Sequence, residues 1–358
     1  MPTNFKWWNF PLLLLSIFAL LAAMWAGLLR LGWNWPLLVN SLPISHGPLM
    51  VSGFFGTLIS LERAVALNKR WSYLGPLASG IGGLLLLSGL GGLTGPWLLT
   101  LSSLGLVFVF AAVLRQRSAS DTWMMAAGGL SWFVGNALWL SGKPVYQVVW
   151  WWAGFLVLTI AGERLELGRM MRLSNFSRAL FFGAAILFGA GLIVQFVQFD
   201  TGTRIMGAGI LGIALWLARY DIARFTVRQK GLARYIAVSL LSGYFWLGIS
   251  GLSVILVGAE SAGPMYDLIL HSVFVGFVFG MVFGHAPIIF PAVLGLDIRY
   301  SSIFYLPLIL LQASLALRVV GSLAGLILVR QWGGLLNAFA ILAFLPLVAP
   351  IRREKPLN

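Results

Sequence analysis

The chain of 358 residues contains no cysteine. This absence excludes disulfides, iron–sulfur clusters, thiolate metal sites and cysteine nucleophiles together. Charged residues are also scarce, at 9% of the sequence, whereas a typical soluble domain carries about 25%. In contrast, 59% of the residues are hydrophobic. The composition therefore excludes a soluble globular or disordered protein and indicates an all-α polytopic membrane protein.

Twelve stretches of the sequence are long and apolar enough to cross a bilayer core about 30 Å thick. The first has no small-residue cleavage site after it, so it is predicted to be a span rather than a removable signal peptide. The connections are short, and we expect a single transmembrane domain over residues 1–358. The spans are placed near residues 8–30, 45–66, 73–92, 96–114, 122–141, 146–164, 178–198, 203–219, 234–257, 265–288, 302–320 and 332–349.

Basic residues outnumber acidic ones, with 24 Lys and Arg against 10 Asp and Glu. If the N-terminus is cytoplasmic, 19 of the 24 lie at cytoplasmic ends and loops, as the positive-inside rule requires. Both termini are then cytoplasmic. The basic residues are scattered and form no patch, which argues against a nucleic-acid partner. Five fall on the outer side, namely Arg30, Lys143, Arg204, Arg318 and Arg330.

Three of the expected spans share a motif at fixed spacing. The segments 53–63 and 154–164 both begin with Gly-Phe and end with Glu-Arg, at an offset of 101 residues. The segment 276–285 begins with Gly-Phe at an offset of 223 and has His285 in place of the glutamate. Chance alignment of apolar helices is the alternative. Because these spans are four apart, we predict three four-helix pseudo-repeats, near residues 1–118, 119–230 and 231–358.

All three histidines lie in expected spans, where an ionisable side chain indicates a functional site by default. His46 opens the second span, whereas His271 and His285 lie near opposite ends of the tenth. Their separation of 14 residues, about 21 Å along a helix, prevents one metal ion from binding both. His46 and His271 are expected at a similar depth, as two axial haem ligands would be, with Arg318 and Arg330 to neutralise the propionates. The alternative is that both histidines only hydrogen-bond a backbone carbonyl.

Glu62, Glu163 and His285 share one repeat position near the cytoplasmic ends of three spans. Two carboxylates and an imidazole suit a divalent metal ion, and they also suit proton transfer. A third interpretation needs no function, because each glutamate precedes an arginine and a salt-bridged helix end explains both pairs. The sequence leaves these three interpretations open.

Twelve spans with histidines on the second and tenth resemble the catalytic subunit of haem-copper oxidases and nitric oxide reductases. The segment His46-Gly47-Pro48-Leu49-Met50 is similar to the His-Gly-x-x-Met start of that family's second helix. The sixth span has no histidine and no His-His pair follows it, so the binuclear centre of the oxidases cannot form. A closer resemblance is to the NnrS family, which pairs a histidine-containing second helix with a later His…Gly-His segment.

The resemblance to NnrS implies haem b in a bacterial inner membrane, and it leaves copper open as a second metal. It implies a role in nitric oxide handling or the nitrosative-stress response, with a diatomic gas as a partner besides the lipid bilayer. Carried over onto this sequence, the candidate haem or metal ligands are His46, His271 and His285. No catalytic reaction or catalytic residue follows from it.

Three functions remain open at this point. The first is a haem-binding redox or gas-responsive membrane protein. The second is a cofactor-free secondary transporter, a class in which internal repeats and intramembrane acids occur; however, most acids here lie at span ends and no interrupted helix pair marks a midplane substrate site. The third is a copper or haem carrier, in which Met50 and Met265 would matter more than paired histidines.

Overall fold

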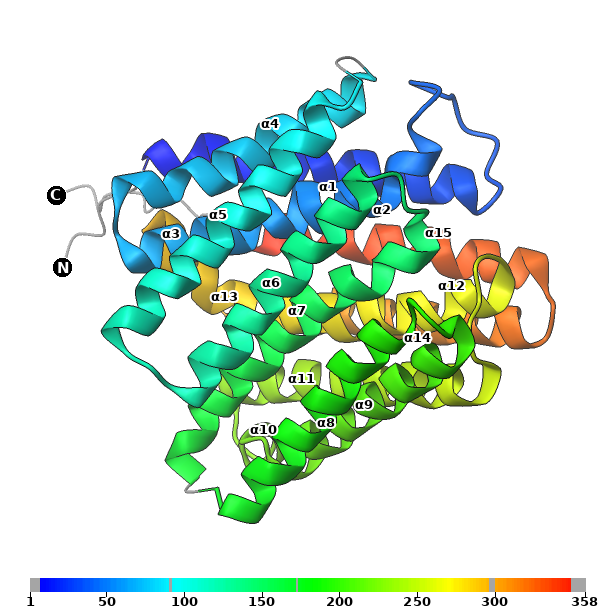
Figure 1. Cartoon of the computed structure of the whole chain (residues 1–358). Helices are drawn as coiled ribbons and strands as arrows, with labels where there is room; N and C mark the ends of the chain where they lie inside the picture. Colours follow the sequence, from blue (N-terminus) through cyan, green and yellow to red (C-terminus); the bar gives the residue numbers. More distant parts are fainter. Residues whose placement is uncertain (1–6, 90–91, 172, 296–299, 349–358) are drawn as a thin grey trace, which may run out of the picture.

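The computed structural model describes residues 7–89, 92–171, 173–295 and 300–348, and these ranges are helical and contain no β-strand (Figure 1). Both chain ends lie outside them, so the cytoplasmic location of the termini stays a prediction. Six of the basic residues assigned to the cytoplasmic side also lie outside the described ranges, namely Lys6, Arg172, Arg299, Arg352, Arg353 and Lys355, and the cytoplasmic location of the other thirteen is likewise a prediction.

Within the described ranges, ten helical spans are long and apolar enough to cross a membrane, as a multi-pass membrane protein requires. Two of them, Pro43–Leu67 and Gly263–Val293, are composite. The other eight are built on α1 (Phe10–Arg30), α5 (Thr94–Gln116), α7 (Val145–Leu167), α8 (Asn175–Val194), α9 (Phe199–Tyr220), α11 (Gly231–Val257), α14 (Tyr305–Leu323) and α15 (Ile327–Phe344).

The sequence predicts twelve spans, but only ten helical spans in the described ranges are long and apolar enough to cross a membrane. The expected spans 73–92 and 122–141 are occupied by α4 (Leu74–Ser88) and α6 (Ser120–Leu140), which pack against α5 and α7 but fall outside the ten. Helix α4 has 15 residues, about 22 Å of helix against a core of about 30 Å. Helix α6 is long enough, but it carries Asp121 and Asn136, which lower its apolarity.

The outward faces of the peripheral helices carry large apolar side chains. Ile186 on α8, Leu215 on α9 and Phe339 on α15 are each at least 60% exposed. Soluble monomers rarely expose contiguous apolar surface on this scale. Lipid is the solvent that such faces fit.

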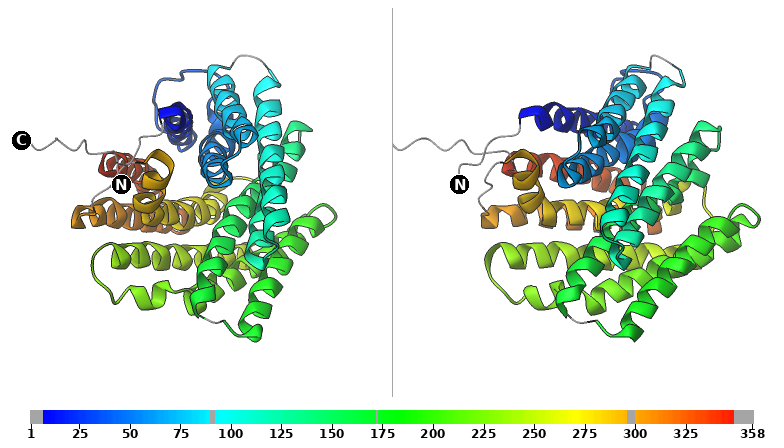
Figure 2. Two further views of the ribbon diagram at one scale, coloured as in Figure 1. Left: turned by 90° about the vertical axis from the view of Figure 1, so that its left-hand side faces the viewer. Right: turned by 60° about the vertical axis from the view of Figure 1, so that its left-hand side comes forward.

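Three spans are more enclosed than the other seven. The spans differ in the buried share of an 18-residue apolar stretch within each. It is 67% in Pro43–Leu67, 78% in Val145–Leu167 and 72% in Gly263–Val293, and at most 56% in the other seven spans. These are the spans in which the Gly-Phe motif recurs. A Cβ atom added at the first glycine of any of the three motifs would meet a neighbouring side chain within 3.0 Å, so the missing side chains permit close helix approach. Figure 2 shows the yellow α12–α13 span between the blue first helices and the yellow-green α11.

Both composite spans contain an eight-residue π-helical segment. Leu49–Gly56 joins α2 (His46–Pro48) to α3 (Thr57–Leu67), and Ser272–Phe279 joins α12 (Gly263–His271) to α13 (Gly280–Leu294). The two segments begin 223 residues apart, which is the offset of the Gly-Phe motif. Segments of π-helix are rare and often lie at functional sites. Here each one follows a histidine, His46 or His271, within three residues.

A buried hydrogen-bond network holds the first π segment against α5, α6 and α7. The side-chain oxygen of Asn136 accepts from Ser52 at 3.0 Å and from the Trp152 indole at 2.9 Å. Its amide nitrogen donates to the Leu99 carbonyl at 3.0 Å. The Trp132 indole donates to the Ser52 hydroxyl at 2.9 Å. One asparagine thus joins the span of His46 to the adjacent hairpin.

Substituting Asn136→Ala should destabilise the fold, because buried donors on Ser52 and Trp152 would lose their acceptor. The expected cost is about 1–3 kcal/mol, measured as a lower midpoint of thermal unfolding in detergent. Ser141→Ala is the control, since that hydroxyl is exposed and bonds only within its own helix end. Equal midpoints for both variants would contradict the role given to Asn136.

Candidate functional site

A cavity of about 520 Å³ lies between the two composite spans and helices α1, α7, α14 and α15. Its volume is typical of a site for a cofactor or small ligand. Buried side chains of Val51, Val275 and Phe279 wall its inner part. Exposed residues, Arg30 and the loop 261–263, form part of its rim. The inner wall is therefore largely apolar, with Arg318 and Asn337 as buried polar side chains in it.

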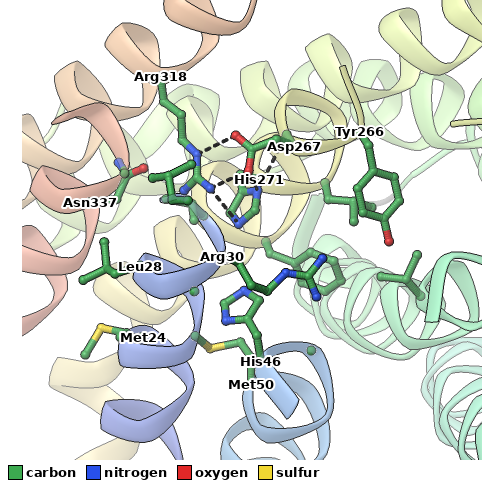
Figure 3. Close-up of a pocket in the computed structure, with 18 of the residues that line it drawn as sticks. Met24, Leu28, Arg30, His46, Met50, Tyr266, Asp267, His271, Arg318 and Asn337 are labelled. Atoms are coloured by element: carbon green, nitrogen blue, oxygen red, sulfur yellow. Dashed lines mark hydrogen bonds and ion pairs between the residues drawn. The ribbon is translucent and has the colours of Figure 1, made fainter. Parts of the chain in front are cut away.

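His46 and His271 face each other across this cavity (Figure 3). Their ring centroids are 6.2 Å apart and the ring planes are inclined by 22°. The Nδ1 of His46 lies 2.7 Å from the Ala23 carbonyl, and that of His271 lies 2.8 Å from the Asp267 carbonyl. Because a carbonyl only accepts, each Nδ1 carries the proton and each Nε2 presents a lone pair. Metal-ligating histidines are commonly held in this way.

Helix α1 approaches His46 closely because position 27 is glycine. A Cβ atom at Gly27 would lie 2.7 Å from Cε1 and 2.9 Å from Nδ1 of the imidazole. The same helix supplies the carbonyl of Ala23 that orients the ring. Gly27 and Ala23 together therefore fix the direction in which His46 points.

Arg318 on α14 holds Asp267 and His271 of α12 together. Its Nε and Nη2 donate to the two carboxylate oxygens of Asp267 at 2.8 and 2.6 Å. The same Nη2 lies 3.2 Å from Nε2 of His271, to which it donates. Oδ1 of Asp267 is 3.2 Å from Nδ1 of His271. Both nitrogens of His271 are therefore engaged, whereas Nε2 of His46 has no hydrogen-bond partner among the described residues.

The cavity has a positive balance of charge. Arg30, Arg318 and Arg330 line it together with one carboxylate, that of Asp267. Arg318 forms an ion pair with Asp267, but neither Arg30 nor Arg330 has a carboxylate partner in the part of the chain that the structure describes. The cavity therefore suits a ligand that carries an anionic group.

The two imidazoles fit a pair of axial metal ligands in distance. Metal–imidazole bonds of about 2 Å place the two ligating nitrogens about 4 Å apart and the ring centroids about 6 Å apart, close to the 6.2 Å between His46 and His271. The apolar wall and the cationic rim suit the faces and the carboxylates of a haem. One contact opposes ligation, because the hydrogen bond from Arg318 occupies Nε2 of His271 and must break.

The inner candidates Glu62 and Glu163 share one arginine. Arg63 forms an ion pair with Glu62 at 3.1 Å and a second, shorter one with Glu163. This joins α3 to α7 across the central spans. Glu62 thus pairs with the arginine that follows it, whereas Arg164, which follows Glu163, pairs with Asp221 instead. Within the described ranges, no group of three or more His, Asp or Glu side chains is arranged to hold a metal ion.

His285 belongs to a neighbouring ion-pair group and does not line the cavity. Arg164 donates from Nε to Asp221 at 2.9 Å and from Nη1 to Nε2 of His285 at 2.9 Å. Nδ1 of His285 is bonded to the Met281 carbonyl at 2.8 Å. The structure thus brings His46 and His271 together and places His285 apart from them.

Some residues of these two sites are not predicted by the sequence patterns above. Asp267 lies one helical turn before His271, and an acid inside an apolar span is the signal that points to it. Arg30 adjoins the cavity only because α1 packs on α2. Asp221 is 57 residues from its partner Arg164, so no local spacing relates the two.

A family model described as "Domain of unknown function (DUF8744)" matches residues 9–352. The chain belongs to this family. No curated protein matches the chain, and no solved structure does. The matched range includes all three histidines and both ion-pair groups. Since the family description assigns no activity, the function has to be argued from the cavity and its side chains.

Removing one partner of the buried Arg164–Asp221 pair should destabilise the protein strongly. These side chains are 4% and 1% exposed, and breaking such a pair costs about 3–5 kcal/mol because a buried charge is left uncompensated. Arg164→Met should therefore lower the midpoint of thermal unfolding in detergent. The control is Arg117→Met, whose pair with Glu166 is 56% and 43% exposed and contributes about 0–1 kcal/mol. Similar unfolding midpoints for Arg164→Met and Arg117→Met would contradict the conclusion that the buried ion pair stabilises the protein more than the exposed one.

Proposed function

We propose that this protein is a haem-binding integral membrane protein in which His46 and His271 are the axial ligands. The observation that carries the proposal is the pair of imidazoles, 6.2 Å apart across an apolar cavity, each oriented by a backbone carbonyl at Nδ1. Hydrogen bonds from Nδ1 to a backbone carbonyl are also expected of a histidine at the membrane interface that binds no metal. The cavity that both imidazoles line favours ligation.

The side chains around the pair have distinct parts in this proposal. His46 and His271 would hold the iron, and Val51, Val275 and Phe279 would exclude water from the bound haem. Arg30 and Arg330, which have no carboxylate partner within the described ranges, would face the carboxylates of the haem. Bound haem b would supply iron for electron transfer or for binding a diatomic gas.

The resemblance to NnrS supports a role in the nitric oxide or nitrosative-stress response, or in electron transfer, with nitric oxide or another diatomic gas as the partner. The location proposed with it is a bacterial inner membrane, with both termini cytoplasmic. The charge distribution supports this orientation, because the outer side has only five of the 24 basic residues.

Three four-helix repeats and twelve spans belong to the same proposal. Two observations support the repeats, namely the matching offset of the π segments and the enclosure of the three spans that carry the Gly-Phe motif. Helices α4 and α6 occupy the two positions that a count of twelve requires.

Copper is the second candidate, either as a companion of haem or as the cargo of a carrier. The thioethers of Met24 and Met50 line the cavity on the side of His46 (Figure 3). Thioether and imidazole ligands together suit Cu(I). Metal analysis of the purified protein distinguishes the candidates. A haem protein should contain iron in proportion to its Soret absorbance, whereas a copper carrier should contain copper and show no Soret band.

The purified wild-type protein should show a Soret band, and the variants should separate the histidines. His46→Ala should lose the bound haem, because the remaining ligand is engaged by Arg318. His271→Ala should change the reduced spectrum, since one axial ligand is gone. His285→Ala is the control and should leave the spectrum intact. An unchanged reduced spectrum in either cavity variant would exclude that histidine as an axial ligand.

The orientation can be tested with single cysteines, because the natural chain has none. Lys143 and Lys69 are both exposed and lie on opposite sides in the proposed topology. In spheroplasts, whose inner membrane is intact, a membrane-impermeant maleimide should label Lys143→Cys. It should label Lys69→Cys only after the spheroplasts are lysed. The reverse pattern would invert the proposed orientation.

A further inference from the structure

The two histidines of the cavity are not equivalent. Nε2 of His46 is free of hydrogen-bond partners in the described part of the chain, whereas Nε2 of His271 accepts from Nη2 of Arg318 at 3.2 Å. An imidazole nitrogen has one lone pair, which serves either a hydrogen bond or a metal bond. Ligation by His271 therefore has a competitor that ligation by His46 lacks.

Arg318, which competes with a metal for Nε2 of His271, is fixed in place. Arg318 is 7% exposed and donates through two nitrogens to the carboxylate of Asp267. Helix α15 packs on it closely, because a Cβ atom at Gly333 would lie 2.6 Å from the Arg318 backbone nitrogen, and one at Gly334 3.5 Å from its guanidinium. The bidentate ion pair and this packing hold the guanidinium in place, so the imidazole of His271 has to turn away from Nη2 before its Nε2 can bind a metal.

We infer that His46 would be the fixed ligand of a bound haem and His271 the displaceable one, and that Arg318 would donate to Nε2 of His271 whenever this imidazole is not bound to the iron. The inference rests on the proposed function. An imidazole that leaves the iron would not be left unpaired, because its Nε2 would accept the N–H of Arg318 as it does in the structure. Figure 3 shows the guanidinium and the two rings around one space.

Arg318 then has a second part in the same step. Its guanidinium has five N–H donors, and two of its nitrogens already serve Asp267. Nη2 serves Asp267 and His271, whereas Nη1 has no hydrogen-bond partner among the described residues, so the N–H groups of Nη1 would remain for a small ligand in the cavity. The arrangement predicts a haem site that a small ligand can open, rather than one closed permanently by two histidines.

The test compares carbon monoxide binding and spin state in the haem-loaded full chain in detergent. The variant is Arg318→Met with Asp267→Asn, which removes the competitor without leaving a buried charge unpaired and keeps the Asp267 carbonyl on Nδ1. We expect a shift to the six-coordinate low-spin form and a loss of carbon monoxide affinity of about tenfold or more. Arg164→Met with Asp221→Asn is the matched control, since it removes a similar Arg–Asp pair away from the cavity, and it should bind carbon monoxide as the wild type does.

The outcomes separate this inference from the proposed function. A wild-type protein without a Soret band overturns both. A Soret band with the same spin state and carbon monoxide affinity in wild type and Arg318 variant overturns only the inference, and so does an equal change in the matched control. If the double variant does not fold, Arg318→Lys replaces it: an ammonium lacks the planar fork that serves Asp267 and His271 together, so the same shift should appear, and its absence overturns the inference.

Discussion

The ion pair between Arg318 and Asp267 is the interaction on which the outer site depends. It joins α14 to α12 and places Nη2 of Arg318 beside His271. Because it neutralises the carboxylate of Asp267, the positive charges of Arg30 and Arg330 remain in the cavity lining. A charge inside an apolar bundle is tolerated only when it is paired. The pairing therefore explains both why Asp267 is present and why His271 has a fixed orientation.

The same three-residue arrangement occurs at both ends of the tenth expected span. Arg318 contacts Asp267 and His271 at the outer end, and Arg164 contacts Asp221 and His285 at the inner end. In each group the histidine Nδ1 is bonded to the carbonyl four residues earlier. The groups differ in their surroundings, since the outer one lines the cavity that His46 also lines, whereas Arg164, Asp221 and His285 do not line that cavity. That difference, rather than the group itself, makes the outer end a candidate for ligand binding.

Depth and register could be predicted from particular residues. His46 opens the second span, and an offset of 223 brings its repeat partner within two residues of His271, so similar depth follows from counting along helices. The number of spans is less certain from apolarity, because α4 is short and α6 contains Asp121 and Asn136. Such helices are stabilised by neighbours such as Ser52 and Trp152, and these contacts are invisible in a hydropathy pattern.

The order of residues alone determined that the chain folds as apolar helices, which of them carry histidines, and how far apart those histidines lie along one helix. The tertiary structure decided which lone pairs are free, since that depends on side chains from other helices. Ala23 reaches His46 from α1 and Arg318 reaches His271 from α14. Contacts across tens or hundreds of residues follow from packing geometry, and no local spacing encodes them.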